Sequence, residues 1–318
     1  MKTDSAFQIG KTHDICEDFA LTGSFKSTGD DAYYAIVSDG CSSSPNTDLG
    51  SRLLSFSIAN ELKQLYTNSS ERYKISKKLR NLSDDLCIAR ARSSIQSLNL
   101  PQDSLDATAL IAYTEPGKTE IAIKGDGCVA IGLKDKRTLI VNVEFISSFP
   151  FYLNYLPEYG HRYMSWKLKN LENDGGRKVV ISIINKDGSY EVLNGNCMVD
   201  TFKYEENKKE HLNSEKWIST QWNNQGAEIS FINPNKNVVE FIVLMSDGIN
   251  SFYRTENNDT SLINSNIDYR EVISEALNFK NFNGKFVQRR LNRFTKFCQN
   301  NDWHHSDDIS FGAIYFGE

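Results

Sequence analysis

The chain has 318 residues, of which 39% are hydrophobic and 24% are charged, an ordinary globular composition that argues against disorder. Its formal net charge of -5 excludes a general attraction to nucleic acid or anionic lipid, because such binding needs clustered Lys and Arg. The N-terminus has no apolar signal segment, and no run approaches the roughly 18 apolar residues that would span a bilayer. We therefore expect a cytoplasmic protein that binds neither nucleic acid nor membrane and keeps its six cysteines as free thiols.

The first half of the chain predicts a strand, then helices, then further strands. Residues 32–38 are β-prone and end at the turn dipeptide Asp39-Gly40. Apolar residues three or four apart predict one helix from about Thr47 and a second over residues 72–98. Four strands joined by turns that suit antiparallel hairpins follow at residues 107–113, 119–124, 128–133 and 138–145.

The second half predicts more strands and a late helix. Strands at 179–184 and 190–193 flank Asp187-Gly188, which we interpret as an ordinary hairpin turn. The apolar run at 238–245 is typical of a buried central strand. A helix over 287–298 and a terminal strand at 309–316 complete the order. Residues 147–225 have weak periodicity and are interpreted in part as an insertion or flap over the main body.

Because the predicted helices are grouped rather than alternating with strands, the order favours an α+β fold. Two stacked antiparallel β-sheets flanked by helices fit it. We expect residues 1–318 to form a single domain, with an insertion or flap at about 147–225.

Acidic residues recur where predicted strands end. The motifs are Glu17-Asp18, Asp39-Gly40, Asp126-Gly127, Asp247-Gly248 and Asp307-Asp308. A single Asp-Gly is usually a structural turn, but Asp39 and Asp247 each follow an apolar strand and a serine. A carboxylate at the end of a buried strand is costly unless its charge is compensated, so a shared cation is our hypothesis. Oxygen ligands of this kind suit Mn²⁺ or Mg²⁺.

Six segments resemble, in the same order, the motifs of the metal-dependent PP2C (PPM) family of protein phosphatases, in a divergent form of bacterial type. They are CEDF (16–19), AIVSDG (35–40), DATAL (106–110), KGDG (124–127), FIVLMSDG (241–248) and SDDIS (306–310). The resemblance implies a PP2C-like α-β-β-α sandwich and hydrolysis of phosphoserine and phosphothreonine in proteins. It also implies two or three Mn²⁺ or Mg²⁺ ions, a phosphorylated protein substrate and a cognate Ser/Thr kinase.

The resemblance further implies a set of metal ligands. They are Asp39 bridging two ions, Asp247 and Asp307 on the first, Glu17 and the Gly40 carbonyl on the second, and Asp126 on a weaker third. A water held between the ions would attack phosphorus directly, so that no covalent enzyme intermediate is needed. Asp18 and Asp308 would be supporting neighbours.

Two positions depart from the family pattern. His13 stands where many members have an Arg that grips the substrate phosphate, a task that a protonated imidazole could perform. Cys41 follows Asp39-Gly40 where the family often has His or Met, and we interpret it as a small filler.

These departures leave three functions open. The first is an active protein phosphatase, with Asp39 and His13 as its catalytic residues. The second is a catalytically silent member that binds phosphorylated partners or regulates a kinase. The third is a hydrolase of small phosphate esters whose specificity residues 147–225 would set.

Overall fold

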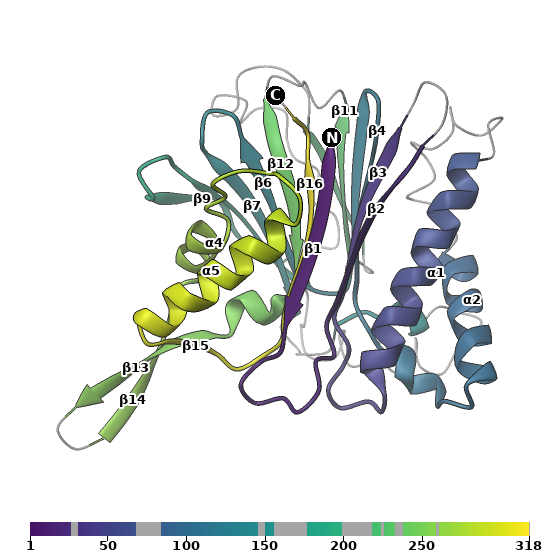
Figure 1. Cartoon of the computed structure of the whole chain (residues 1–318), viewed down its shortest axis with the longest axis horizontal. Coiled ribbons are helices and arrows are strands. Elements are labelled where there is room, and N and C mark those ends of the chain that lie inside the picture. Colours follow the sequence, from purple (N-terminus) through teal and green to yellow (C-terminus); the bar gives the residue numbers. More distant parts are fainter. Residues whose placement is uncertain are drawn as a thin grey trace.

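Two antiparallel sheets stacked face to face form the body of the protein in the computed structural model (Figure 1). The structure describes residues 1–26, 31–67, 84–145, 150–155, 177–198, 218–223, 226–232, 238–258 and 261–317. The first sheet has seven strands in the order β1 (Lys2–Gln8), β16 (Ile309–Tyr315), β12 (Val239–Met245), β6 (Gly127–Leu133), β7 (Thr138–Phe145), β8 (Arg177–Ile184) and β9 (Tyr190–Met198).

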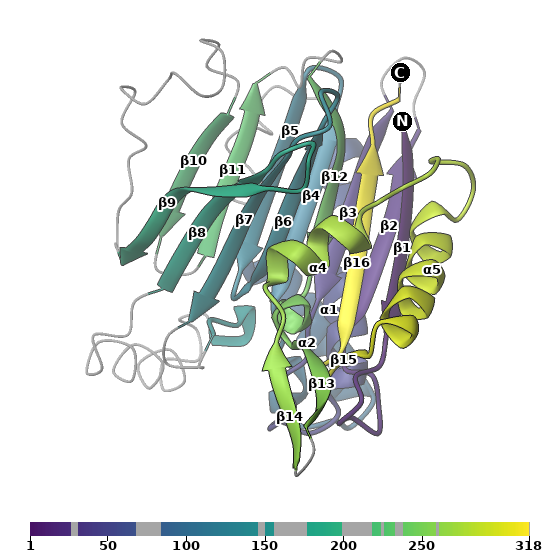
Figure 2. The ribbon, with the colours of Figure 1, turned by 90° about the vertical axis from the view of Figure 1, so that its left-hand side faces the viewer.

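The second sheet has six strands, and a small third sheet projects beyond the sandwich (Figure 2). In the second sheet the order is β10 (Ile218–Asn223), β11 (Gly226–Ile232), β5 (Lys118–Lys124), β4 (Ala109–Glu115), β3 (Ala32–Ser38) and β2 (Phe19–Phe25). The third consists of β14 (Ser261–Asn266), β13 (Phe252–Asn258) and β15 (Trp303–His305).

Helices cover the outer face of each sheet (Figures 1 and 2). The second sheet is covered by α1 (Thr47–Thr67) and α2 (Asp84–Ser97), and Leu54, Ile58 and Leu62 form the buried stripe of α1. This stripe joins the residues between the sheets in one large apolar cluster. Such burial is the main force that holds the layers together.

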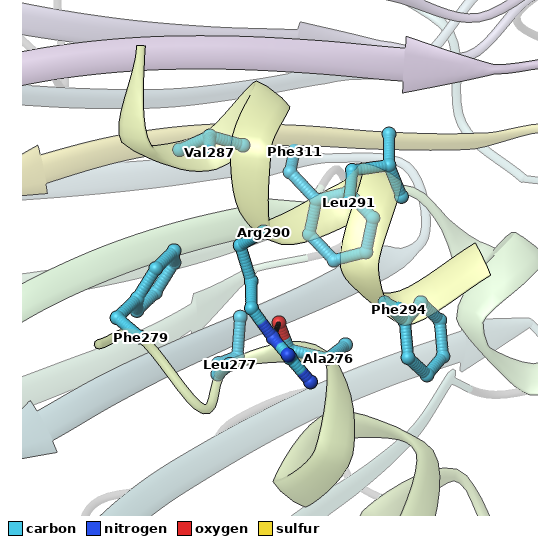
Figure 3. A pocket seen from close by; sticks show the side chains of 8 residues that line it. All are labelled: Ala276, Leu277, Phe279, Val287, Arg290, Leu291, Phe294 and Phe311. Atoms are coloured by element: carbon cyan, nitrogen blue, oxygen red, sulfur yellow. Dashed lines mark hydrogen bonds between the residues drawn. The ribbon is translucent and has the colours of Figure 1, made fainter. Parts of the chain in front are cut away.

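The first sheet is covered by α4 (Tyr269–Ala276) and α5 (Phe286–Asn300), which pack on it through a second apolar cluster. Figure 3 shows where the two helices meet, beside a cavity of about 10 Å³. There the buried Arg290 of α5 donates from Nε to the Ala276 carbonyl oxygen at 3.1 Å. This bond satisfies a carbonyl that the end of α4 would otherwise leave without a partner.

The predicted α+β sandwich is confirmed. Strand β3 has the predicted bounds of residues 32–38, and α1, α5, β4–β9, β12 and β16 lie where strands or helices were expected. The predicted helix over 72–98 corresponds to α2 from Asp84, because its earlier part lies outside the described residues. The polar edge strand β1 was not predicted, since only Ala6 of its seven residues is buried.

Much of the predicted insertion at 147–225 lies outside the described residues. Its described parts include residues 150–155, which contain the short 3-10 helix Leu153–Tyr155, and the strands β8, β9 and β10. These strands lie at or near the ends of the two main sheets. Among the described helices, none has the length and apolar character needed to cross a membrane.

Candidate active site

The acidic residues singled out in the sequence lie at one end of the sandwich, which we call the acidic rim. Glu17 precedes β2, Asp39 follows β3, Asp126 joins β5 to β6, Asp247 follows β12, and Asp307 precedes β16. Within each sheet, neighbouring strands end at the same level here. In the first sheet Met245 of β12 pairs with Cys128 of β6, and in the second sheet Phe19 of β2 pairs with Ser38 of β3. The acidic rim therefore takes carboxylates from both main sheets.

The backbone around Asp39 is held firmly against the start of β4. The Asp39 N–H donates to Thr108 Oγ1 at 3.0 Å, and the Asp39 carbonyl accepts the Thr108 N–H at 2.8 Å. Gly40 follows in a tight space, where a Cβ atom would come within 2.8 Å of Thr47 Cβ and 3.1 Å of the Glu17 carbonyl oxygen. A glycine is needed there because any side chain would push Thr47 and Glu17 away.

The Asp39 side chain meets two other carboxyl groups, those of Asp18 and Asp247. Burial, followed by the charges of Asp18 and Asp247, raises the pKa of Asp39 well above its usual value. Burial likewise raises the pKa of Asp18 to about 7, although Ser246 Oγ donates to its Oδ2 at 2.6 Å. Two ionised carboxylates have no hydrogen to share, so these contacts are repulsive unless a proton or a cation lies between them.

Asp126 and Asp307 add to the same concentration of charge. Burial and the charge of Asp247 raise the pKa of Asp126 well above its usual value and that of Asp307 to about 6. Two buried oxygens, Asp18 Oδ1 and Asp247 Oδ1, have no hydrogen-bond donor among the described residues. The acidic rim thus contains more hydrogen-bond acceptors than donors.

Glu17 and His13 lie on the connection from β1 to β2. Thr47 Oγ1 donates to Glu17 Oε1 at 2.7 Å, and the Glu17 N–H donates to Asp308 Oδ2 at 2.6 Å. His13 Nε2 lies 3.5 Å from Asp307 Oδ1, and its Nδ1 lies 3.2 Å from Asp308 Oδ2. Burial opposes protonation of His13, but contact with Asp308 and the charges of Asp308, Asp307 and Glu17 outweigh it and raise the pKa of His13.

The donor set fits a hard divalent cation, because the predicted ligands are all oxygens and carry uncompensated negative charge. The described residues nevertheless contain no group of three or more His, Cys, Asp or Glu side chains already arranged as a finished metal site. What the geometry provides is contact between pairs of carboxyl groups, as in Asp39 with Asp18 and Asp39 with Asp247.

Sequence reasoning missed several groups that support the acidic rim. The hydroxyl groups of Thr47 and Ser246 hold Glu17 and Asp18 in place. A serine before Asp247-Gly248 is visible in the sequence and signals one of them. Tyr152 gave no such signal, since it lies in the weakly periodic region. Its buried hydroxyl contacts the Cys41 side chain beside the acidic rim, and burial raises the pKa of this tyrosine.

A larger cavity of about 470 Å³ lies at the far end of α1, next to β2 and β3. Its described lining includes Lys26, Lys63 and three aromatic residues, and none of the carboxylates of the acidic rim. Since α1 begins beside the acidic rim at Thr47 and lines the cavity from Ala59 to Thr67, the helix separates the two places by about 20–30 Å. This cavity is therefore not part of the candidate active site.

Comparison with known proteins gives one family model and a number of matching solved structures. A family model described as Protein phosphatase 2C matches residues 11–295. No curated protein matches the chain.

Among solved structures, a bacterial serine phosphatase is 14% identical with a TM-score of 0.49, over 100% of this chain and 98% of that chain. Serine/threonine phosphatase Stp1 from Staphylococcus aureus is 13% identical with a TM-score of 0.49, over 100% and 95% of the two chains. The S. agalactiae serine/threonine phosphatase is 13% identical with a TM-score of 0.46, over 99% and 98%.

Proposed function

The chain belongs to the protein phosphatase 2C family, and from this premise we propose that it hydrolyses phosphoserine and phosphothreonine in proteins with bound Mn²⁺ or Mg²⁺. The observation that carries the metal requirement is the contact of Asp39 with both Asp18 and Asp247. Such crowding destabilises the ionised groups at neutral pH, and a divalent cation would relieve it.

We assign the predicted ligands as follows: Asp39, Asp247 and Asp307 for a first ion, Asp39, Glu17 and the Gly40 carbonyl for a second, and Asp126 for a weaker third. When bound, such ions lower the pKa of water and offset negative charge on phosphoryl oxygens. The residues of the chain hold the carboxylates in place for this task. Asp39 is fixed by Thr108, and Glu17 is fixed by Thr47 and Asp308.

His13 is proposed to contact the substrate phosphate. The neighbouring carboxylates favour its protonated, cationic form, and its Nε2 lies 3.5 Å from Asp307 Oδ1 at the acidic rim. A cation at this place attracts a phosphate and stabilises charge that develops on its oxygens. His13 thus takes the task that an Arg performs in many family members.

We propose one phosphatase domain over residues 1–318, because the proposed ligands come from the ends of strands in both main sheets. The sandwich must form as a whole before Asp39 and Asp247 can meet. A phosphorylated protein substrate follows from the proposed activity. A cognate Ser/Thr kinase and a cytoplasmic location stay predictions of the sequence.

The test is Mn²⁺-dependent hydrolysis of p-nitrophenyl phosphate by the wild type and by Asp39→Asn. We expect turnover that requires the cation and falls by at least about 100-fold in the variant. Absence of turnover by the folded wild type in both Mn²⁺ and Mg²⁺ would contradict the proposal and support a catalytically silent regulator. Comparison of kcat/KM for phosphopeptides and small phosphate esters then separates a protein phosphatase from a small-ester hydrolase.

A further inference from the structure

We infer that Asp308 is a positioning residue that ties the segment of residues 10–17 to the start of β16, so that His13 and Glu17 both face the acidic rim. The inference rests on the proposed function, because it assigns His13 to the phosphate and Glu17 to a metal ion. It adds a residue whose side chain, at 1% exposure, would not itself touch a substrate.

The contacts of Asp308 converge on both ends of this segment. Its Oδ1 accepts the Gly10 N–H at 2.7 Å, and its Oδ2 accepts the Glu17 N–H at 2.6 Å. Its Oδ2 also lies 3.2 Å from His13 Nδ1. One buried side chain thus contacts the first residue of the segment, the proposed phosphate-binding residue and the proposed metal ligand.

The chain needs such a tether because the segment from Gly10 to Glu17 lies outside regular structure. Where it begins, it continues alongside the start of β16, with the Thr12 N–H and Thr12 Oγ1 both donating to the Ser306 carbonyl oxygen. The fit is close, because a Cβ atom on Gly10 would lie 2.4 Å from the Asp307 carbonyl carbon. Beyond Thr12, Asp308 contacts both His13 and Glu17, in addition to the bonds from Thr47 and Ser51 to Glu17.

An ionised carboxylate is well suited to this role. Both of its oxygens accept hydrogen bonds, and bonds from N–H groups to a charged acceptor are about twice as strong as neutral ones. An asparagine would offer one acceptor oxygen and place an NH₂ donor opposite the other N–H. Asp308→Asn therefore breaks one end of the tether with little change in side-chain volume.

Asp4 provides a matched control far from the acidic rim. Its Oδ2 also accepts two backbone N–H groups, from Val287 at 2.6 Å and Gln288 at 3.2 Å, where α5 begins. Asp4→Asn can keep both bonds on its one amide oxygen but loses the charge of the acceptor, so it weakens a tether at a place that contacts no proposed ligand. A purely structural Asp308 would behave like Asp4.

The experiment measures three quantities for the wild type, Asp308→Asn and Asp4→Asn: Mn²⁺ affinity by calorimetry, KM and kcat for p-nitrophenyl phosphate, and the melting temperature. We expect both variants to melt at lower temperature. Only Asp308→Asn should weaken Mn²⁺ binding and raise KM, each by about tenfold or more, because replacing a residue that orients metal ligands commonly has an effect of this size. Asp4→Asn should stay within about twofold of the wild type.

Two results distinguish a failure of the proposed role of Asp308 from a failure of the proposed function. A wild type that binds no Mn²⁺ would contradict the proposed function. A wild type that binds Mn²⁺, with Asp308→Asn matching Asp4→Asn in affinity and KM, would overturn the inference alone.

Should Asp308→Asn lack a cooperative melting transition, Thr12→Ala takes its place, since it removes the 2.6 Å bond to Ser306 in the same segment. Thr12→Ala should raise KM by about threefold, and an unchanged KM would count against the tether.

Discussion

The two ends of the sandwich treat their acidic side chains in opposite ways. At the end away from the acidic rim, Asp135 accepts a hydrogen bond from Arg137 Nε at 2.8 Å, and this bond lowers the pKa of Asp135. Asp187 accepts from Ser189 Oγ at 2.6 Å and from the Ser189 N–H, which also lowers its pKa. At the acidic rim, burial and neighbouring carboxylates raise the pKa values of Asp39 and Asp307 instead.

The surroundings of an aspartate, not its residue type, therefore distinguish a hairpin-turn residue such as Asp187 from a proposed metal ligand such as Asp247. Asp187 and Asp247 both stand before a glycine at the end of a strand. The first is exposed in a hairpin turn and satisfied by donors within its own turn. The second has a buried oxygen without a donor among the described residues and lies among other carboxylates. Only the second arrangement invites a cation.

The largest difference in turnover is expected between a variant that loses an aspartate charge at the acidic rim and a variant that loses one at the opposite end of the sandwich. Asp247→Asn is expected to lower Mn²⁺-dependent turnover of p-nitrophenyl phosphate by at least about 100-fold, because it removes a proposed metal ligand. Asp187→Asn changes the same dipeptide at the opposite end and should alter turnover by less than about twofold, as expected of a surface site. Equal losses of turnover in Asp247→Asn and Asp187→Asn would contradict the proposed difference between the two ends.

Cation binding should stabilise the acidic rim. A ligand at 100 times its Kd adds about 2.7 kcal/mol to the free energy of unfolding. For a chain of this size we expect Mn²⁺ to raise the melting temperature by roughly 5 °C, and by much less in Asp247→Asn. Scanning calorimetry with and without Mn²⁺ checks this. A rise of the same size in wild type and Asp247→Asn would place the bound ion elsewhere.

The metal-free protein should become less stable as the pH rises from 5 to 8. The pKa is raised to about 7 for Asp18 and to about 6 for Asp307, and that of Asp39 is also raised. A carboxyl group with a raised folded pKa contributes stability that is full below its unfolded pKa, near 4, and is lost as the pH passes the folded pKa.

The measurement for this prediction is the metal-free melting temperature across that range, in buffer with EDTA. The lowered pKa of Asp135 at the opposite end has its effect at lower pH, as protonation disrupts its bond to Arg137. A melting temperature that rises between pH 5 and 8 would mean that the carboxyl groups of the acidic rim do not repel one another.

The smallest expected effects concern hydroxyl partners. Ser246 Oγ donates to Asp18 Oδ2 at 2.6 Å and accepts the Ser310 N–H at 3.0 Å, all in the interior. Ser246→Ala leaves these groups without a partner and should lower the free energy of unfolding by about 1–3 kcal/mol in urea titrations. Ser189→Ala removes an exposed bond to Asp187 and should cost less than about 0.5 kcal/mol. Equal costs would mean that burial adds nothing to the Ser246 contacts.

The sequence predicts the sandwich well, for physical reasons, and the role of the acidic residues stays a prediction. Apolar strands such as β12 and the helical stripe of α1 are local patterns that the fold preserves. The polar edge strand β1 escapes prediction because it lacks such a pattern. The contact between Asp39 and Asp247 also depends on how the two sheets stack, which no local pattern records. The resemblance to a family supplied that pairing.

We propose that Asp39, Asp247 and Asp307 bind divalent cations together at the acidic rim. The most direct test is anomalous diffraction at the manganese edge from crystals grown in Mn²⁺. We expect at least one anomalous peak in contact with the Asp39 carboxylate and with Asp247 or Asp307. Crystals that contain Mn²⁺ in solution but show no peak at these carboxylates would contradict the claim.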